Sequence, residues 1–210
     1  MTMKIADNAL VLFQGDSVTD AGRSRDGDSN LGSGYAGMIA AMASALHPEK
    51  NIRFINRGIS GDRVKDLQDR WQADCIALKP DWVSILIGIN NTWRRYDSND
   101  PTPAAEFEKG YRDILEKTRR HTKARIILCE PFVLPVQEDR RTWREDLDPK
   151  IQVVRNLAVE FKAFLLPLDG IFAQAAAVRE PGFWTPDGVH PSPAGHALIT
   201  QAWLKLVGAM

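Results

Sequence analysis

The chain has 210 residues, of which 44% are hydrophobic and 26% are charged, and 27 basic side chains balance 27 acidic ones. This length suffices for one α/β domain with a substantial core, which we expect over residues 1–210. Because the formal net charge is zero, we expect no nucleic-acid partner. No apolar run reaches the length of a membrane helix, so we expect no membrane partner either.

Short apolar runs alternate with helical patterns along the whole chain. Strands are predicted over residues 9–13, 52–55, 82–87, 125–129 and 164–168. Helices are predicted over residues 35–46, 64–78, 106–121 and 147–163, and a last helix starts after Ser192-Pro193 and ends near Gly208. Continuous apolar strands that alternate with helices are typical of a parallel sheet covered on both faces. The sequence therefore predicts a three-layer α/β/α sandwich with roughly five parallel strands.

The segment Gly15-Asp16-Ser17 directly follows the first predicted strand. Gly15 permits a sharp bend there, and chemistry in open α/β sheets collects at the carboxyl ends of strands. A serine hydroxyl becomes a strong nucleophile only when a base removes its proton. The chain has four histidines, and His190, which lies three residues after Asp187, is the best candidate for this base. Together these segments indicate a serine hydrolase.

Two further segments follow predicted strands. Asn56-Arg57-Gly58-Ile59-Ser60-Gly61 comes after the second strand, and Gly88-Ile89-Asn90-Asn91 comes after the third. Residues 20–34 and 130–144 are the long irregular segments, and such segments often shape a substrate site. Because the strand ends of a parallel sheet open at one edge, we expect both segments to meet Ser17 and His190 there.

These four blocks, in this order, resemble the SGNH hydrolases, also called the GDSL-type esterase superfamily. The blocks are Gly15-Asp16-Ser17, Asn56-x-Gly58-x-x-Gly61, Gly88-x-Asn90 and Asp187-x-x-His190. Residues 15–23, 56–61, 80–90 and 93–97 carry a closer resemblance, to intracellular acetylxylan esterases and related carbohydrate acetylesterases. The resemblance implies a flavodoxin-like SGNH hydrolase fold. Pro186 departs from that subgroup, in which an aromatic residue can precede the aspartate.

The residues of these blocks fit the chemistry of a serine esterase. Ser17 is expected to attack the ester carbonyl, and His190 to take its proton and return it to the leaving alcohol. Asp187 is expected to orient the imidazole and to stabilise its charged form. The backbone N–H groups of Ser17 and Gly61 and the carboxamide of Asn90 are expected to form the oxyanion hole. This mechanism requires no metal and no cofactor, and we expect neither.

Five residues are candidates for substrate binding: Asp16, Trp93, Arg94, Tyr96 and Trp184. The three aromatic residues fall in segments predicted to be irregular, where they either stack on sugar rings or anchor the loops. Arg94 either bonds sugar hydroxyls or lies on the solvated surface. Asp16 is also expected to accept hydrogen bonds from backbone N–H groups around the turn.

The sequence predicts an esterase that removes O-acetyl groups from carbohydrates, and the resemblance implies acetylated xylo-oligosaccharides. One alternative is a thioesterase or lysophospholipase-like esterase, which needs an apolar tunnel; the polar, glycine-rich segment 20–34 disfavours one. A second is a metal-dependent phosphoesterase that uses Asp16, Asp20, Asp187 and His190. A third is a non-catalytic sugar-binding protein, which the presence of Ser17, Asp187 and His190 disfavours.

The remaining expectations concern other side chains and the setting of the protein. Cys75 and Cys129 belong to no metal-type cluster and are expected to be buried free thiols, with a disulfide between them left open. His47 and His121 are expected to be exposed, and His196 to pack or lie at the surface. The N-terminus shows no signal-peptide pattern, so we expect a cytoplasmic protein. Neutral charge and loop aromatics favour a homo-oligomer.

Overall fold

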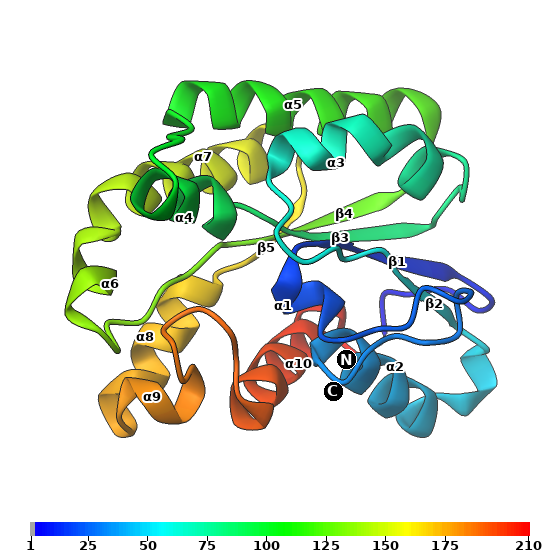
Figure 1. Cartoon of the computed structure of the whole chain (residues 1–210). Coiled ribbons are helices and arrows are strands. Elements are labelled where there is room, and N and C mark those ends of the chain that lie inside the picture. Colours follow the sequence, from blue (N-terminus) through cyan, green and yellow to red (C-terminus); the bar gives the residue numbers. More distant parts are fainter. Residues whose placement is uncertain (1–2) are drawn as a thin grey trace.

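The structure is a computed structural model that describes residues 3–210, so residues 1 and 2 of the predicted domain lie outside it. Within the described range, five parallel strands form one sheet in the order β2-β1-β3-β4-β5 (Figure 1). The strands are β1 (Leu10–Gly15), β2 (Arg53–Asn56), β3 (Trp82–Leu86), β4 (Arg125–Cys129) and β5 (Phe164–Leu166). Every predicted strand is confirmed: the strand over 125–129 has the predicted ends, and the ends of the others differ by at most two residues.

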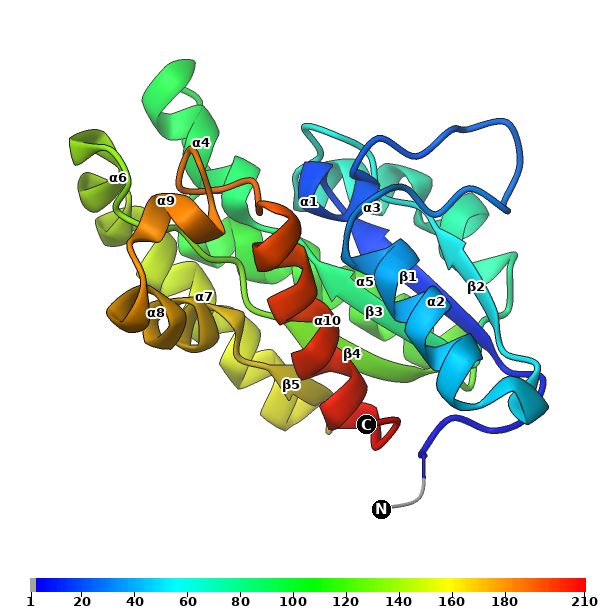
Figure 2. The ribbon, with the colours of Figure 1, turned by 90° about the horizontal axis from the view of Figure 1, so that it is seen from below.

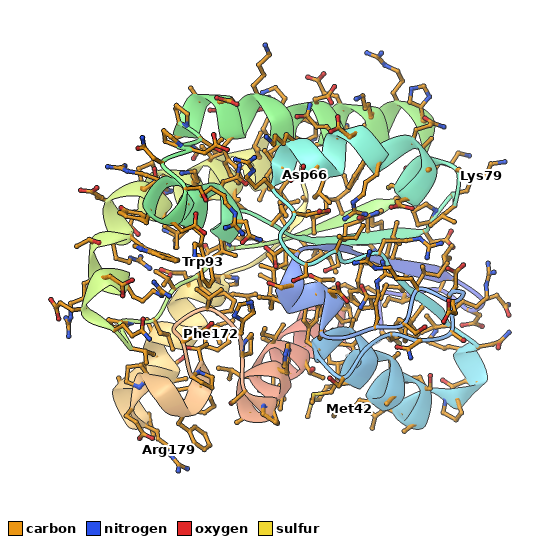
Figure 3. All side chains as sticks on the ribbon, in the orientation of Figure 1. Met42, Asp66, Lys79, Trp93, Phe172 and Arg179 are labelled. Carbon is orange, nitrogen blue, oxygen red and sulfur yellow. The ribbon has the colours of Figure 1, made fainter. Side chains whose placement is uncertain are left out.

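Helices cover both faces of this sheet (Figures 1 and 2). One face carries α3 (Val64–Trp71), which continues as a π-helical turn over Gln72–Ile76, together with α5 (Ala104–His121) and α7 (Arg144–Glu160). The other face carries α2 (Tyr35–Leu46), α8 (Leu168–Val178) and α10 (Pro193–Val207). Met42 and Phe172 lie on the side of α2 and α8, and Asp66 lies on the opposite side (Figure 3). The predicted three-layer sandwich is confirmed.

The side chains of β1 show how the sheet separates two core layers. Successive side chains of a strand point to opposite faces. Leu10 and Leu12 therefore join the buried cluster under α3, α5 and α7, whereas Val11 and Phe13 join the cluster under α2, α8 and α10. Because helices cover both faces of the sheet, β1 is buried along its whole length. Its last residue, Gly15, directly precedes the segment of Ser17.

Four short helices complete the fold: α1 (Ser17–Asp20), α4 (Ile89–Asp97), α6 (Glu138–Thr142) and α9 (Pro181–Trp184), with a 3-10 turn over Pro48–Lys50. The prediction that residues 93–96 and 183–184 are irregular was therefore wrong, since they belong to α4 and α9. The first residues of α4 include two asparagines and a threonine, which favour helices weakly. They are buried, so tertiary packing stabilises a helix that local propensity does not indicate.

The helix α8 was not predicted either. Its sequence places alanines on several sides, which blurs the helical period on which the prediction depends. Cys75 and Cys129 are buried free thiols, as predicted. Across residues 3–210, no helix is both long enough and apolar enough to span a membrane.

Candidate active site

The turn between β1 and α1 places Ser17 at the carboxyl edge of the sheet. Glycine is required at the end of β1, because a Cβ on Gly15 would lie 2.3 Å from Leu86 O. Asp16 caps the helix that follows, since its Oδ1 accepts the Val18 N–H at 3.0 Å. The close approach to β3 and the cap together fix the backbone of Ser17, the first residue of α1.

Hydrogen-bond contacts connect Ser17 to two residues near the other end of the chain. Ser17 Oγ lies 2.9 Å from His190 Nε2, and His190 Nδ1 lies 2.6 Å from Asp187 Oδ2. The side chains of His190 and Asp187 are 46% and 36% exposed, so the imidazole is open to solvent on one side. The structure thus brings together the three residues that the sequence predicts to be catalytic.

The segment from Asp187 to His190 folds around its own carboxylate. Asp187 Oδ1 accepts the backbone N–H of Val189 at 2.9 Å and that of His190 at 2.7 Å. Gly188 has a φ of +89°, and a Cβ on it would lie 2.5 Å from Leu134 O, so a side chain is excluded there. This local geometry fixes one carboxylate oxygen and leaves the other facing the imidazole.

The electrostatics of the site follow from these contacts. Partial burial opposes ionisation of Asp187, but the hydrogen bonds from the His190 ring and from the backbone hold the pKa of this carboxyl well below its usual value. The hydrogen bond that the His190 ring donates to Asp187 raises the pKa of His190, although partial burial opposes this. Burial raises the pKa of Asp16 from 3.8 to about 7. At neutral pH Asp187 is therefore fully ionised beside His190, whereas Asp16 is ionised only in part.

A cavity of about 190 Å³ opens beside Ser17 and His190. Ser17, Ser60, Gly61, Asn90, Trp93, Arg94, Asp97 and His190 line it. Asn90 is the second residue of α4, and its Nδ2 donates to Asp62 O at 3.1 Å. A carboxamide nitrogen carries two hydrogens, so the second N–H of Asn90 remains for a ligand. Gly61 has a φ of +90°, and apart from its two chain neighbours no described atom lies within 4 Å of where its Cβ would stand.

Two of the five predicted substrate-binding residues line this cavity. The Trp93 ring lies 5.9 Å from that of His190, measured between centroids, and Arg94 forms an ion pair with Asp97. The sequence reasoning missed Asp97 and Ser60, which also line the cavity. A helical prediction for residues 93–97 would have indicated Asp97, because residues three apart on a helix are neighbours.

The other three predicted substrate-binding residues lie outside the lining of this cavity. The Asp16 side chain is buried and caps α1, which agrees with the backbone hydrogen bonding expected of it. The Tyr96 ring stacks on Trp143, with centroids 5.5 Å apart, and its hydroxyl donates to a backbone carbonyl of α6. The Trp184 indole donates to Ala175 O on α8. The polar atoms of Tyr96 and Trp184 therefore hold neighbouring helices together.

The other histidines lie elsewhere in the fold. His196 packs between α10 and α2, accepts the Tyr35 N–H at 3.1 Å, and has its pKa lowered by burial to about 4. His121 is exposed, as predicted. His47 was predicted to be exposed but is half-buried, because its ring nitrogen lies 2.9 Å from Ala209 O. Over the described residues, no three His, Cys, Asp or Glu side chains are grouped so as to hold a metal ion.

Comparison with known proteins identifies the family. The sequence model of the GDSL-like lipase/acylhydrolase family matches residues 13–198. An acetylxylan esterase from Geobacillus stearothermophilus is 38% identical over 98% of this chain and 97% of the relative. The crystal structure of Axe2, an acetylxylan esterase from the same organism, matches with a TM-score of 0.91. A structure described as a GDSL-like lipase from Parabacteroides merdae is 31% identical, covers 100% of both chains and matches with a TM-score of 0.93.

Solved variants of Axe2 include catalytic mutants in which a serine, an aspartate or a histidine is replaced by alanine. The replaced aspartate and histidine are three residues apart, as are Asp187 and His190 here. The predicted resemblance and the predicted enzyme class, a carboxylic ester hydrolase, are confirmed. With a family match across most of its length and a relative of 38% identity, this chain belongs to the GDSL-like lipase/acylhydrolase family.

Proposed function

We propose that this protein is a serine esterase that removes O-acetyl groups from carbohydrates, with acetylated xylo-oligosaccharides as its substrate class. One observation carries the proposal: Ser17 Oγ lies 2.9 Å from His190 Nε2 at the wall of a polar cavity of about 190 Å³. The 38% identity to an acetylxylan esterase over 98% of the chain supports the choice of substrate.

The first step forms the acyl-enzyme. Ser17 Oγ attacks the carbonyl carbon of the acetyl ester while His190 Nε2 accepts the hydroxyl proton. Positive charge then develops on the imidazole, and the Asp187 carboxylate, 2.6 Å from Nδ1, stabilises it. Because Asp187 stays ionised, it orients the ring and takes no proton itself.

The tetrahedral intermediate carries a negative oxygen, which needs hydrogen-bond donors already in place. We assign this role to the second N–H of Asn90 and to the backbone N–H groups of Gly61 and Ser17. All three residues line the cavity, and Asn90 is held by its hydrogen bond to Asp62 O. Since these donors come from α4, the loop after β2 and the start of α1, the sheet edge itself fixes their spacing.

Collapse of the intermediate releases the sugar. The ester C–O bond breaks, His190 Nε2 returns its proton to the departing sugar oxygen, and acetyl-Ser17 remains. Water then attacks the acetyl carbonyl while His190 accepts a proton from it. The second tetrahedral intermediate breaks the bond to Ser17 Oγ, which recovers its proton, and acetate leaves.

The lining of the cavity favours a short acyl group on a polar alcohol. Ser60, Asn90, Arg94 and Asp97 supply hydroxyl, amide and charged groups, and Trp93 supplies an aromatic surface. Such groups bond sugar hydroxyls, and an indole packs against a sugar ring. A long acyl chain, as in a thioesterase or lysophospholipase-like enzyme, requires an apolar channel instead.

A series of p-nitrophenyl esters from acetate to dodecanoate tests this proposal. We expect the rate to be highest for acetate, to fall with acyl length, and to be lost in Ser17→Ala. Ser44→Ala, which changes an exposed serine on α2, is the matched control and keeps the wild-type rate. A Ser17-dependent rate that grows with chain length would instead favour the thioesterase or lysophospholipase-like alternative.

We further propose that the protein is cytoplasmic and forms a homo-oligomer. The two buried free thiols support a reducing compartment. Val159 and Val178, which are 81% and 86% exposed, are apolar side chains that an interface between two copies would bury. Cell fractionation tests the location. Sedimentation equilibrium tests the assembly, and a monomer mass at micromolar concentration contradicts it.

A further inference from the structure

Arg140, on α6, contacts the loop that carries Asp187 and His190. Its Nε donates to Asp187 O at 3.1 Å, and its side chain is only 9% exposed. Its aliphatic stem lies beside Gly188, where a Cβ would stand 3.2 Å from Arg140 Cγ. Leu134 adds a second contact, because its N–H donates to Gly188 O at 2.8 Å. The loop is therefore held from outside at two consecutive residues.

The guanidinium of Arg140 also lies against two indole rings. Its Cζ is 4.0 Å from the ring centroid of Trp143 and 5.1 Å from that of Trp93. Trp93 lines the cavity and packs in turn against the His190 ring. A planar guanidinium is well suited to such a position, because it stacks on aromatic faces and still donates at its edge. Arg140 thus connects the loop to the aromatic wall of the site.

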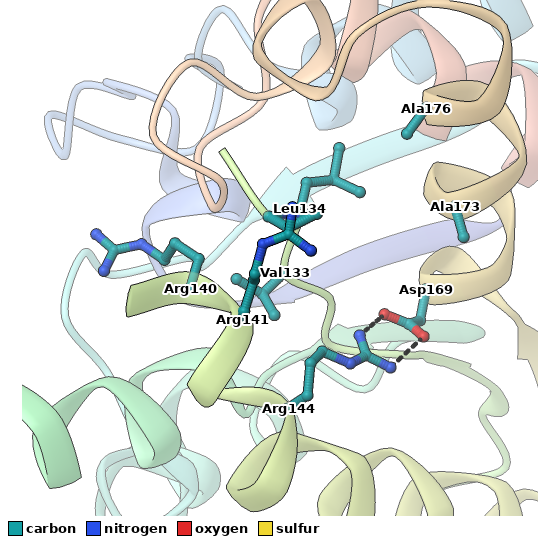
Figure 4. Close-up of a pocket in the computed structure, with 9 residues that line it drawn as sticks. Val133, Leu134, Arg140, Arg141, Arg144, Asp169, Ala173 and Ala176 are labelled. Atoms are coloured by element: carbon teal, nitrogen blue, oxygen red, sulfur yellow. Dashed lines mark hydrogen bonds and ion pairs between the residues drawn. The ribbon is translucent and has the colours of Figure 1, made fainter. Parts of the chain in front are cut away.

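The neighbouring arginines have other partners. Arg140, Arg141 and Arg144 all line a cavity of about 430 Å³ beside α8. Arg144 pairs there with Asp169 at 2.6 Å, and Arg141 pairs with Glu138 at 3.4 Å. Arg140 points away from the pair formed by Arg144 and Asp169 (Figure 4). Arg141 is 64% exposed and follows Arg140 directly in the chain, so it provides a matched control of the same residue type.

We propose that Arg140 is a positioning residue, which holds the backbone of Asp187 in place and sets a positive charge near the His190 imidazole. The proposal rests on the proposed esterase function and deepens it. No step of the reaction passes through Arg140, which touches neither the ester nor the nucleophile. It acts on the geometry of the loop and on the proton affinity of the base that the loop carries.

Charges from several elements face His190. Asp187, on the same loop, raises the pKa of His190, and partial burial opposes this. Asp16, in the turn before α1, raises the pKa further, whereas Arg140 lowers it. Removal of the positive charge of Arg140 should therefore raise the pKa of His190.

Other charged groups near Arg140 and His190 do not cancel this effect. Asp139 pairs with Arg140 at 2.5 Å, but its side chain is 57% exposed, and a solvated partner neutralises a charge only in part. Arg94 and Asp97, on α4, line the cavity beside His190 and form an ion pair with each other. Their opposite charges offset one another at the imidazole.

Three variants separate the effect of Arg140 on the position of the loop from the effect of its charge. Arg140→Met removes the hydrogen bond to Asp187 and the positive charge. We expect kcat for p-nitrophenyl acetate to fall by about 10- to 100-fold, and the acid limb of the kcat/KM profile to move to higher pH. Arg140→Lys keeps the charge but loses the planar stacking and the Nε donor, so kcat falls while the midpoint of the limb stays near the wild-type value. Arg141→Met changes neither quantity.

A titration of the His190 ring by NMR, in the Ser17→Ala background, measures the same effect without turnover. His190→Gln identifies the resonance among the four histidines. We expect Arg140→Met to raise the pKa of His190 and Arg141→Met to leave it in place. A thermal melt shows whether the Arg140→Met variant folds. If it does not, Arg140→Gln, with a shorter and polar side chain, serves as the neutral variant.

The proposal is overturned if a folded neutral variant of Arg140 leaves both the kinetic midpoint and the titration of His190 unchanged, or if Arg140→Lys keeps the wild-type kcat. These failures differ from a failure of the proposed function. If the wild-type protein hydrolyses no ester, the function is wrong, and the NMR titration still decides whether Arg140 acts on His190.

Discussion

Asp187 binds His190 twice, through Oδ2 to the ring Nδ1 at 2.6 Å and through Oδ1 to the backbone N–H at 2.7 Å. One carboxylate thus fixes both the ring and the chain that carries it. With Nδ1–H held by the carboxylate, Nε2 faces Ser17 as the acceptor. The loop presents the base in its reactive tautomer before any substrate arrives.

Asp187→Asn should lower kcat for p-nitrophenyl acetate by about 10⁴-fold, because an amide favours the wrong tautomer of the imidazole. It should also lower the pKa of His190, which loses the contact that raises it most. Steady-state kinetics over a range of pH measures both effects. A variant that keeps at least a tenth of the wild-type kcat would show that this carboxylate is not the partner of the base.

The wild-type rate should fall in acid as His190 becomes protonated. Because the folded protein raises the pKa of His190 above 6.5, half of the maximal kcat/KM should be reached above pH 6.5. The Asp187 carboxyl does not contribute in this range, since its pKa is lowered and it stays ionised. A pH profile of kcat/KM for p-nitrophenyl acetate checks this, and a flat profile between about pH 5 and 8 would count against a histidine base.

Asn90→Ala should lower kcat by about 10²- to 10³-fold, with little change in KM, because an oxyanion donor acts mainly in the transition state. Asn90→Asp should do no better, since an ionised carboxylate cannot donate to the oxyanion. The acetate ester gives both constants. If the alanine variant raised KM alone, Asn90 would be a ground-state contact and the oxyanion hole would lie elsewhere.

Two glycine substitutions should change stability in opposite directions. Gly15→Ala forces a Cβ to within 2.3 Å of Leu86 O at the start of the site, so it should destabilise the fold and reduce activity. Gly170 lies in α8, and outside its chain neighbours and the backbone of its own helix no described atom stands within 4 Å of its Cβ position. Gly170→Ala should therefore stabilise the fold by up to about 1 kcal/mol. Urea denaturation measures both, and equal midpoints for the two variants would contradict this interpretation.

Much of the fold could be predicted because parallel strands are buried on both faces. The residues of β1 and β3 are buried throughout and are mostly apolar, so these segments stand out against the helical patterns between them. The short motifs at their carboxyl ends then indicate where Ser17, Gly61 and Asn90 meet. Segment 56–61 does begin at the last residue of β2, and segment 88–91 does follow β3.

The parts that could not be predicted depend on contacts between distant segments. The helix α4 is stabilised by burial of its first turn, so Trp93 and Tyr96 were assigned to a loop. Nothing in the local sequence reveals the hydrogen bond of Arg140 to Asp187 O, because the two residues are 47 positions apart. Tertiary packing decides such contacts between distant residues, so the sequence around Arg140 does not predict them.

The most direct test of the central claim is acetate release from acetylated xylo-oligosaccharides by the wild-type protein beside Ser17→Ala. We predict release by the wild type and a rate lower by about 10⁶-fold in the variant. Circular dichroism should show that the fold of the variant is unchanged. Near-wild-type release by Ser17→Ala would overturn the mechanism. A wild-type protein that hydrolyses long-chain esters but releases no acetate from these sugars would contradict the proposed substrate.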